Sequence, residues 1–315
     1  MQMIIWLVTA LAAVVLAGAY VCYRMVFFAD RRKDPSEEEI QIPKGRIYEP
    51  YREPMERWIR EVRAMDCQEF TVTSFDGLTL HAKYYEYAPG APMEIMFHGY
   101  RGTAERDLSG GVQRCFRLGR SAFIVDQRCS GKSGGHTITF GIREHRDCLT
   151  WMDFVIRHFG QDVKILLTGI SMGASTVVMA AGRQLPPQVI GVLADCGFSS
   201  ARAIIKKVIR QLRLPAGLLY PFVRLGALIY GGFDPEELSA VEAVKRCTVP
   251  VLLFHGEDDD FVPCEMSREL YEACNSRKKL ITVPGAGHGL SYLLDQDGYI
   301  RQAREFFGSE GSAKS

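Results

Sequence analysis

Short apolar runs alternate with helical patterns along most of the chain, and this alternation limits the possible folds more than any other feature. Runs that are apolar throughout are typical of parallel strands covered on both faces. The strand-like runs are Glu94–Phe97, Ala122–Val125, Lys164–Thr168, Val189–Ala194, Val249–Phe254 and Lys279–Val283. The helical stretches between them are Ala104–Leu118, Ile142–Phe159, Met172–Arg183, Cys264–Cys274 and Asp295–Phe307. We therefore expect an α/β fold with a mostly parallel central sheet and helices on both faces.

Two elements are expected before this alternation begins. Phe70–Ser74 and Leu78–Tyr85 flank an Asp76-Gly77 turn, a pattern that predicts an antiparallel hairpin at the start of the sheet. Apolar residues at helical spacing in Pro54–Met65 predict a helix that packs on the body.

The interval between Asp195 and Val249 is too long for one crossover helix and too short for a domain. We expect residues 196–248 to form a helical cap inserted over the carboxyl edge of the sheet. Residues 202–233 contain no acidic residue and six basic ones, which are Arg202, Lys206, Lys207, Arg210, Arg213 and Arg224. This charge pattern is typical of a solvated helix face. Alternatively, the basic face formed by Lys206, Lys207, Arg210 and Arg213 rests on anionic lipid.

Apolar residues dominate the second part of the predicted cap. They are Leu218, Leu219, Tyr220, Phe222, Val223, Leu228, Ile229 and Tyr230. Two interpretations fit them: they line a pocket for an acyl chain, or they form the packing core of the cap itself.

The N-terminus carries a long uncharged segment. From Met3 to Tyr23 only Thr9 and Gly18 are not apolar. At about 1.5 Å per residue this stretch spans roughly 31 Å, close to the ~30 Å core of a bilayer. A cleaved signal peptide is the rival interpretation, but such peptides begin with positive charge and this chain does not. We therefore expect an uncleaved, single-pass transmembrane helix.

The positive charges Arg24, Arg31, Arg32 and Lys33 follow this helix, so the positive-inside rule places the body on the cytoplasmic side. The expected organisation is an anchor at 1–29, a linker and leading helix at 30–66, an α/β domain at 67–308 that includes the cap, and a disordered tail at 309–315.

Charge and cysteine usage exclude several classes of function. Lys and Arg number 38 against 37 Asp and Glu, and this net charge of +1 gives no field that would recruit nucleic acid. The nine cysteines are odd in number and lack CxxC spacing, which argues against a disulfide framework and a zinc site. Gly131-Lys132-Ser133 ends like a phosphate-binding loop, but Asp126 stands where that loop needs glycine.

The strongest chemical signal is Gly169-Ile170-Ser171-Met172-Gly173, which joins a predicted strand to a predicted helix. In that setting GxSxG indicates a nucleophile elbow, because the glycines allow a strained turn that lifts the serine hydroxyl above the sheet. A simple strand-to-helix turn could have the same composition. A serine hydroxyl also needs a histidine to remove its proton and a carboxylate to orient that histidine.

Two histidines follow Ser171. His255 lies at the end of a strand, where a structural role is favoured, whereas His288 lies in the glycine-rich loop after the last strand and is the expected base. The acid is expected in the loop after Val249–Phe254, where the spacing does not choose among Glu257, Asp258, Asp259 and Asp260. A metal site is disfavoured because the run lacks the pattern of a calcium loop.

Five motifs in this order resemble the α/β-hydrolase superfamily. They are His98-Gly99-Tyr100, Asp126-Gln127-Arg128 with the segment to Gly135, the serine elbow, the segment from His255 to Pro263, and Gly287-His288. More narrowly, they look like bacterial membrane-anchored members related to serine aminopeptidase-like and monoacylglycerol-lipase-like hydrolases. Cys129-Ser130 departs from the Gly-His of many relatives, in a loop without a catalytic role.

The resemblance implies the remaining assignments by position. It places the acid at Asp259, with Asp195 as the fallback, and the oxyanion hole at the backbone N–H groups of Tyr100 and Met172. It implies that His98 shapes its loop and transfers no proton.

We therefore expect a serine hydrolase that cleaves lipid-like carboxylic esters through an acyl-enzyme, with no cofactor and no metal. A peptidase or thioesterase could use the same triad, and a binding protein without catalytic activity could share the fold.

Overall fold

The computed structural model describes residues 1–30 and 39–308. The predicted linker at 31–38 and the predicted tail at 309–315 lie outside the described residues. The eight strands form one sheet in the order β1-β2-β4-β3-β5-β6-β7-β8. They are β1 (Gln68–Thr73), β2 (Thr79–Tyr85), β3 (Met93–Phe97), β4 (Ser121–Asp126), β5 (Ile165–Ile170), β6 (Val189–Asp195), β7 (Val251–Gly256) and β8 (Lys278–Val283).

The sheet is mixed in the way that the sequence predicts. β1 and β2 form the antiparallel hairpin, and β2 also pairs antiparallel with β4. All other neighbouring strands run parallel. Because Phe97 pairs with Gly169, the carboxyl ends of β3 and β5 lie beside each other at one edge of the sheet. Loops that leave these two strands therefore meet there.

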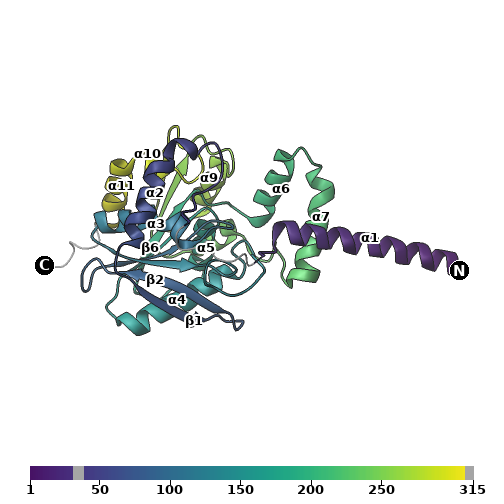
Figure 1. Cartoon of the computed structure of the whole chain (residues 1–315), viewed down its shortest axis with the longest axis horizontal. Coiled ribbons are helices and arrows are strands. Elements are labelled where there is room, and N and C mark those ends of the chain that lie inside the picture. The colour runs from purple at the N-terminus through teal and green to yellow at the C-terminus, as the bar shows by residue number, and fades with distance from the viewer. Residues whose placement is uncertain (31–38, 309–315) are drawn as a thin grey trace.

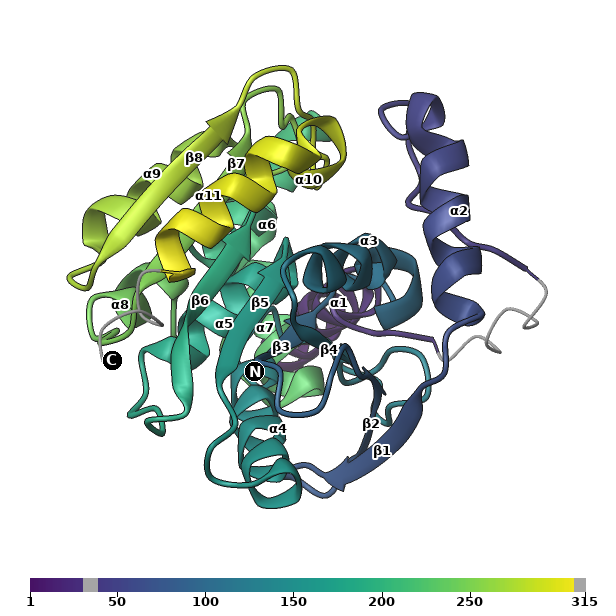
Figure 2. The same ribbon diagram turned by 90° about the vertical axis from the view of Figure 1, so that its left-hand side faces the viewer.

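Helices cover both faces of the sheet, which confirms the expected α/β architecture (Figure 2). One face carries α2 (Arg52–Arg63), α3 (Ala104–Arg117), α10 (Ser291–Leu294) and α11 (Gln296–Gly308). The other carries α4 (Glu144–Phe159), α5 (Met172–Ala181), α8 (Ala240–Val244) and α9 (Cys264–Ala273). A short 3-10 turn, η1 (Glu49–Tyr51), leads into α2.

The segment predicted as a cap contains two kinds of structure. α6 (Ala201–Gln211), α7 (Ala216–Gly226) and the π-helical turn η2 (Ala227–Gly231) stand apart from the sheet, as Figure 1 shows. α8 instead packs against α5 and α9. The described helices that project from the body therefore end at Gly231, before the predicted limit of 248.

α1 (Gln2–Val26) is long and apolar enough to cross a membrane by its length and composition. Residues 2–14 are all exposed, and this part of α1 extends away from the body (Figure 1). The second half packs against α7, where a side chain on Gly226 would overlap the carbonyl oxygen of Ala19. Tyr23 bonds through its hydroxyl to Thr137 Oγ1 at 2.7 Å, and Phe27 is fully buried in the main core. The helix is thus built into the domain at one end only.

A buried ion pair connects β3 to α3 and β5. Glu94 is fully buried and accepts hydrogen bonds from Arg114, from Arg120 at 2.7 Å and from Thr168 at 3.0 Å. Burial raises the pKa of Glu94, but the charges of the two guanidinium groups outweigh that effect and lower the pKa to about 2. Thr168 directly precedes the serine elbow. The hydrogen bond from Thr168 to Glu94 therefore also fixes the strand from which the elbow starts.

We expect Glu94→Leu to lower the free energy of unfolding by about 3–5 kcal/mol, because it leaves two buried guanidinium groups without their carboxylate. Urea unfolding of the detergent-solubilised chain measures the change. The control is Glu61→Ala, which removes a mostly exposed pair with Arg57 and is expected to cost less than about 1 kcal/mol. Equal losses in both variants would contradict this account of the core.

Candidate active site

Ser171 lies at the tight turn between β5 and α5. Its backbone has φ 55° and ψ −118°, a conformation that a residue with a side chain rarely adopts. The turn is possible because two glycines leave room for it. A Cβ atom on Gly169 would overlap the backbone of Gly173, and a Cβ atom on Gly173 would overlap the carbonyl oxygen of Phe97. This is the strand–turn–helix geometry of a nucleophile elbow.

The structure brings Ser171, His288 and Asp259 together from three separate loops. The Nε2 atom of His288 lies 2.9 Å from Ser171 Oγ, and its Nδ1 atom lies 2.7 Å from Asp259 Oδ2. Such a chain can pass the serine proton to the imidazole while the carboxylate stabilises the charged ring. The ring of Phe261 meets that of His288 edge to face at 5.0 Å, which helps to fix its orientation.

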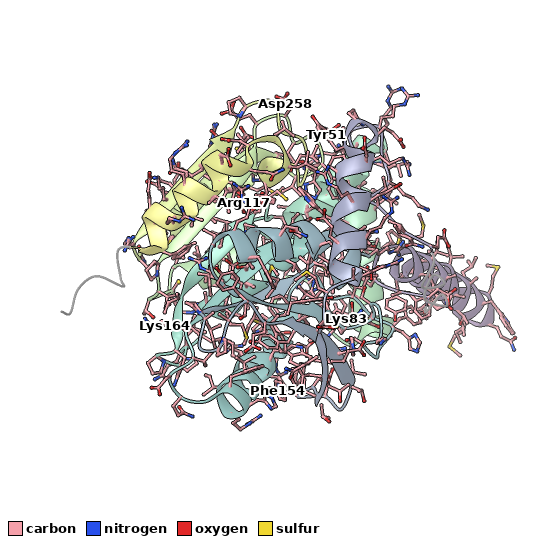
Figure 3. The ribbon with its side chains drawn as sticks, turned by 60° about the vertical axis from the view of Figure 1, so that its left-hand side comes forward. Tyr51, Lys83, Arg117, Phe154, Lys164 and Asp258 are labelled. Atoms are coloured by element: carbon pink, nitrogen blue, oxygen red, sulfur yellow. The ribbon has the colours of Figure 1, made fainter. Side chains whose placement is uncertain are left out.

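Among the four acidic residues of the loop after β7, Asp259 alone is buried. Glu257 accepts a hydrogen bond from the Thr282 hydroxyl, and Asp258 projects at the outer surface (Figure 3). The backbone carbonyl of Asp260, whose side chain is exposed, faces α6 and accepts hydrogen bonds from Lys207 and Gln211. Burial therefore distinguishes Asp259 from its three acidic neighbours, which the spacing alone does not.

The environment of Asp259 keeps it ionised. Burial raises the pKa of its carboxyl, but hydrogen bonds from His255 and His288 outweigh that effect and hold the pKa well below its usual range. The backbone N–H groups of Phe261 and Val262 also donate to Oδ1, at 2.9 and 2.8 Å. Asp259 is thus a fixed negative charge next to the imidazole.

His255 has the structural role that its position indicated, and it also touches the site. Its Nδ1 lies 2.6 Å from Ser267 Oγ, and its Nε2 lies 2.8 Å from the Val262 carbonyl and 3.3 Å from Asp259 Oδ2. It ties the acid loop to α9. Spacing alone does not predict its contact with Asp259, which lies four residues further along the chain.

Asp195, the fallback acid, makes a different contact. Its Oδ1 accepts a hydrogen bond from Ser291 Oγ at 3.0 Å, and its backbone carbonyl accepts from the N–H group of Ser171 at 2.8 Å. Burial raises the pKa of its carboxyl. Asp195 therefore supports the elbow through its backbone, while its side chain is directed to α10.

The loop after β3 brings Tyr100 next to the elbow. The N–H group of Gly99 donates to Asp107 Oδ2 at 3.0 Å, which holds the loop to the first turn of α3. His98 accepts at Nε2 from the Gln127 N–H group at 3.0 Å, so the proton of the neutral ring lies on Nδ1 and reaches the Gly99 carbonyl. Burial lowers the pKa of His98, in agreement with a neutral ring that shapes the loop.

Side chains of the same loop hold the end of α1. The hydroxyl of Tyr100 donates to the carbonyl of Val26 at 2.6 Å. The guanidinium group of Arg101 donates to the carbonyls of Met25 at 2.9 Å and Phe28 at 3.2 Å. The last carbonyls of a helix lack partners within it, so these side chains act as its cap. No motif in the sequence indicated this link.

A cavity of about 1260 Å³ opens over Ser171 and His288. Part of its wall comes from Arg24 at the end of α1 and from Phe28 and Ala29 just after it. Another part comes from the segment before α2, where the hydroxyl of Tyr48 donates to the carbonyl of His288 at 3.0 Å. Tyr48 is a second contact that the sequence pattern did not reveal.

The expectation that apolar cap residues line an acyl pocket is wrong for this cavity. Its described lining contains no residue of α6, α7 or η2. Tyr220 and Val223 are buried within the cap, whereas Leu218, Leu228 and Ile229 are exposed on its outside. The apolar pattern of a helix does not reveal whether its face meets a cavity, a neighbour or the surroundings.

The basic residues of the cap also separate into groups. Lys207 donates to the backbone carbonyls of Asp260 and Phe261, so it connects α6 to the acid loop. Arg224 pairs with Asp234 and Glu236, whereas Arg210 and Arg213 remain exposed near the α6–α7 turn.

Among the described residues, three neighbouring side chains carry atoms that could bind a metal ion. Cys196, Asp259 and His288 each bring a ligand atom to within 4.8 Å of the others. Burial raises the pKa of the Cys196 thiol well above its usual value, so it stays protonated and is a poor metal ligand. The other two side chains are already bonded to each other, and we interpret this group as packing around the histidine.

Residues 169–290 match the model of a protein family described as serine hydrolase (FSH1). Over 310 residues the chain is 26% identical to the uncharacterised protein YqkD of Bacillus subtilis, covering 97% of each chain. It is 24% identical to the protein bem46 of Schizosaccharomyces pombe, covering 77% of each.

Solved structures share the fold. A Pyrococcus furiosus esterase, Pf2001, superposes with a TM-score of 0.65 at 20% identity, over 79% of this chain and 93% of that one. Est1E of Butyrivibrio proteoclasticus, solved with ferulic acid, gives a TM-score of 0.57 at 21% identity, over 75% and 97%. The sheet, the elbow and the family match agree on a serine hydrolase with the α/β-hydrolase fold.

Proposed function

We propose that the protein is an esterase in which Ser171, His288 and Asp259 form the catalytic triad. The observation that carries the proposal is the continuous hydrogen-bonded chain from Ser171 Oγ through His288 to Asp259, at 2.9 and 2.7 Å. His288 accepts the serine proton as Oγ attacks the acyl carbonyl, then returns it to the leaving alcohol. Water activated by the same histidine cleaves the acyl-enzyme.

The oxyanion is held by the backbone N–H groups of Tyr100 and Met172. Tyr100 lies in the loop that Asp107 and His98 fix, and Met172 begins α5 directly after the nucleophile. Donors fixed in advance stabilise the charge that develops on the carbonyl oxygen, and each one contributes about 3 kcal/mol to the transition state.

The substrate class we favour is an ester with a lipid-like acyl chain. Two observations support it: the cavity is large, about 1260 Å³, and Phe28 and Ala29, which follow the apolar helix α1, form part of its wall beside Arg24. Amides and thioesters could react at the same triad, so comparing rates on acyl esters, thioesters and aminoacyl amides of graded length decides between these classes.

We also propose that α1 anchors the protein in the membrane as a single span, with the hydrolase on the cytoplasmic side. The rival signal-peptide interpretation would place cleavage near Ala17-Gly18-Ala19. A Cβ atom on Gly18 would lie 3.3 Å from the ring of Phe222, and Ala19 is fully buried against α7, which favours an uncleaved helix. Arg24 follows the apolar stretch on the side of the body.

A fluorophosphonate probe is expected to label the wild-type chain and to leave Ser171→Ala unlabelled, because the probe reacts only with an activated serine. In-gel fluorescence of the purified full-length protein measures the labelling. Equal labelling of both proteins would overturn the assignment of Ser171.

Asp259→Asn is expected to lower kcat by about 10⁴-fold, because the amide no longer stabilises the charged imidazole or fixes its tautomer. Steady-state hydrolysis of a soluble short-chain ester measures this change. Asp195→Asn is the matched control, since that carboxyl is bonded to Ser291, and it should stay near the wild-type rate. A large loss in the control with none in Asp259→Asn would move the acid to Asp195.

Gly173→Ala is expected to slow fluorophosphonate labelling by about 10²-fold or more, because the new methyl group must displace the turn and move Ser171 from His288. The control is Gly217→Ala in α7, where a Cβ atom meets nothing within 4 Å. Unchanged labelling of Gly173→Ala would show that the elbow tolerates a wider turn.

A further inference from the structure

Exposed large apolar side chains are concentrated on α1 and on the projecting cap. Apart from those of α1 and the first residue, most of the described examples lie between residues 212 and 230. They are Leu212, Leu214, Leu218, Leu228, Ile229 and Tyr230. Exposed apolar side chains gathered in one projecting segment indicate contact with another apolar phase.

The sequence of this part of the cap is unusually poor in charge. Between Arg213 and Asp234 the only charged residue is Arg224, and it pairs with Asp234. The backbone from Ala216 to Gly231 is helical throughout, so most of its polar groups bond within the helix, although Pro221 leaves the carbonyl of Gly217 without its usual donor. Both properties are required of a segment that contacts hydrocarbon.

The length of α1 sets the position of this surface. The part of the helix that the protein leaves fully uncovered runs from Gln2 to Val14 and is about 20 Å long, shorter than the ~30 Å bilayer core. The rest of the apolar stretch, to Tyr23, lies against the cap. Tyr230 donates to the Leu16 carbonyl at 3.1 Å, and the ring of Phe222 lies 3.3 Å from where a Cβ atom on Gly18 would stand. If the whole apolar stretch lies in hydrocarbon, the cap must lie there with it.

We propose that α7 and η2 are immersed in the bilayer beside α1, in the leaflet next to the body. The distance along α1 from Leu16 to Tyr23 gives a depth of about 10 Å. Arg210 and Arg213, exposed at the α6–α7 turn, then lie at the level of the lipid headgroups, where basic side chains are favourable. Arg224 extends to the same level along its aliphatic stem.

The immersion rests on the proposed anchoring by α1 and is independent of the catalytic proposal. In this arrangement the acyl chains of a phospholipid bilayer cover the exposed apolar face of the cap. A helix that spans the membrane alone would instead leave the cap in water, above the headgroups.

Depth-dependent quenching tests the proposal on the full-length chain in phosphatidylcholine–phosphatidylglycerol vesicles. The exposed Cys67 is first replaced in Cys67→Ser, and the remaining label on native thiols is measured and subtracted. A nitrobenzoxadiazole label is then placed by Leu218→Cys or Ile229→Cys on the cap. Val8→Cys places the label on the exposed part of α1 and reports on the proposed membrane span. Tyr87→Cys places the label at an exposed apolar position in the loop after β2 and reports on the part of the body that lies in water.

We expect doxyl-labelled lipid to quench the labels at positions 218 and 229 to an extent similar to that at position 8, and to leave the label at 87 unquenched. Quenching at 8 without quenching at 218 or 229 would overturn the immersion and leave the anchor in place. Absence of quenching at 8 as well would overturn both. None of these outcomes depends on enzyme activity, so the experiment tests the immersion separately from the esterase proposal.

Discussion

The close approach of Gly173 to the carbonyl group of Phe97 is the contact on which the site depends. It lets α5 begin directly against the end of β3, so that the turn at Ser171 can be as tight as its positive φ requires. The same approach places the loop after β3 beside the nucleophile. One packing constraint between two backbones thus brings the serine and the proposed oxyanion donors of Tyr100 and Met172 to one sheet edge.

Much of the fold could be predicted because its signals are local. The apolar runs give the parallel strands, the Asp76-Gly77 turn gives the hairpin, and GxSxG between a strand and a helix gives the elbow. The choice of Asp259 among four neighbouring acids needed resemblance, because burial of one side chain depends on contacts with His255 and on the path of the whole loop.

Contacts between distant segments could not be predicted in the same way. Tyr48 and His288 are 240 positions apart, and no sequence pattern contains both residues. The cap shows a related limit. Leu218 and Tyr220 lie two positions apart on α7, yet one faces outward and the other is buried, and this difference depends on where α6 and α1 pack. Hydrophobicity identified the cap as apolar without giving the direction of its faces.

Tyr100 and Arg101 attach the end of α1 to the hydrolase domain. These side chains use the terminal carbonyls of α1 as acceptors, and Tyr23 and Phe27 occupy the core of the domain. The boundary between the proposed membrane helix and the enzyme therefore does not fall where the apolar sequence ends. The last two turns of α1 belong structurally to the hydrolase, and a truncated form of the enzyme would have to retain them and lose only the exposed turns before residue 15.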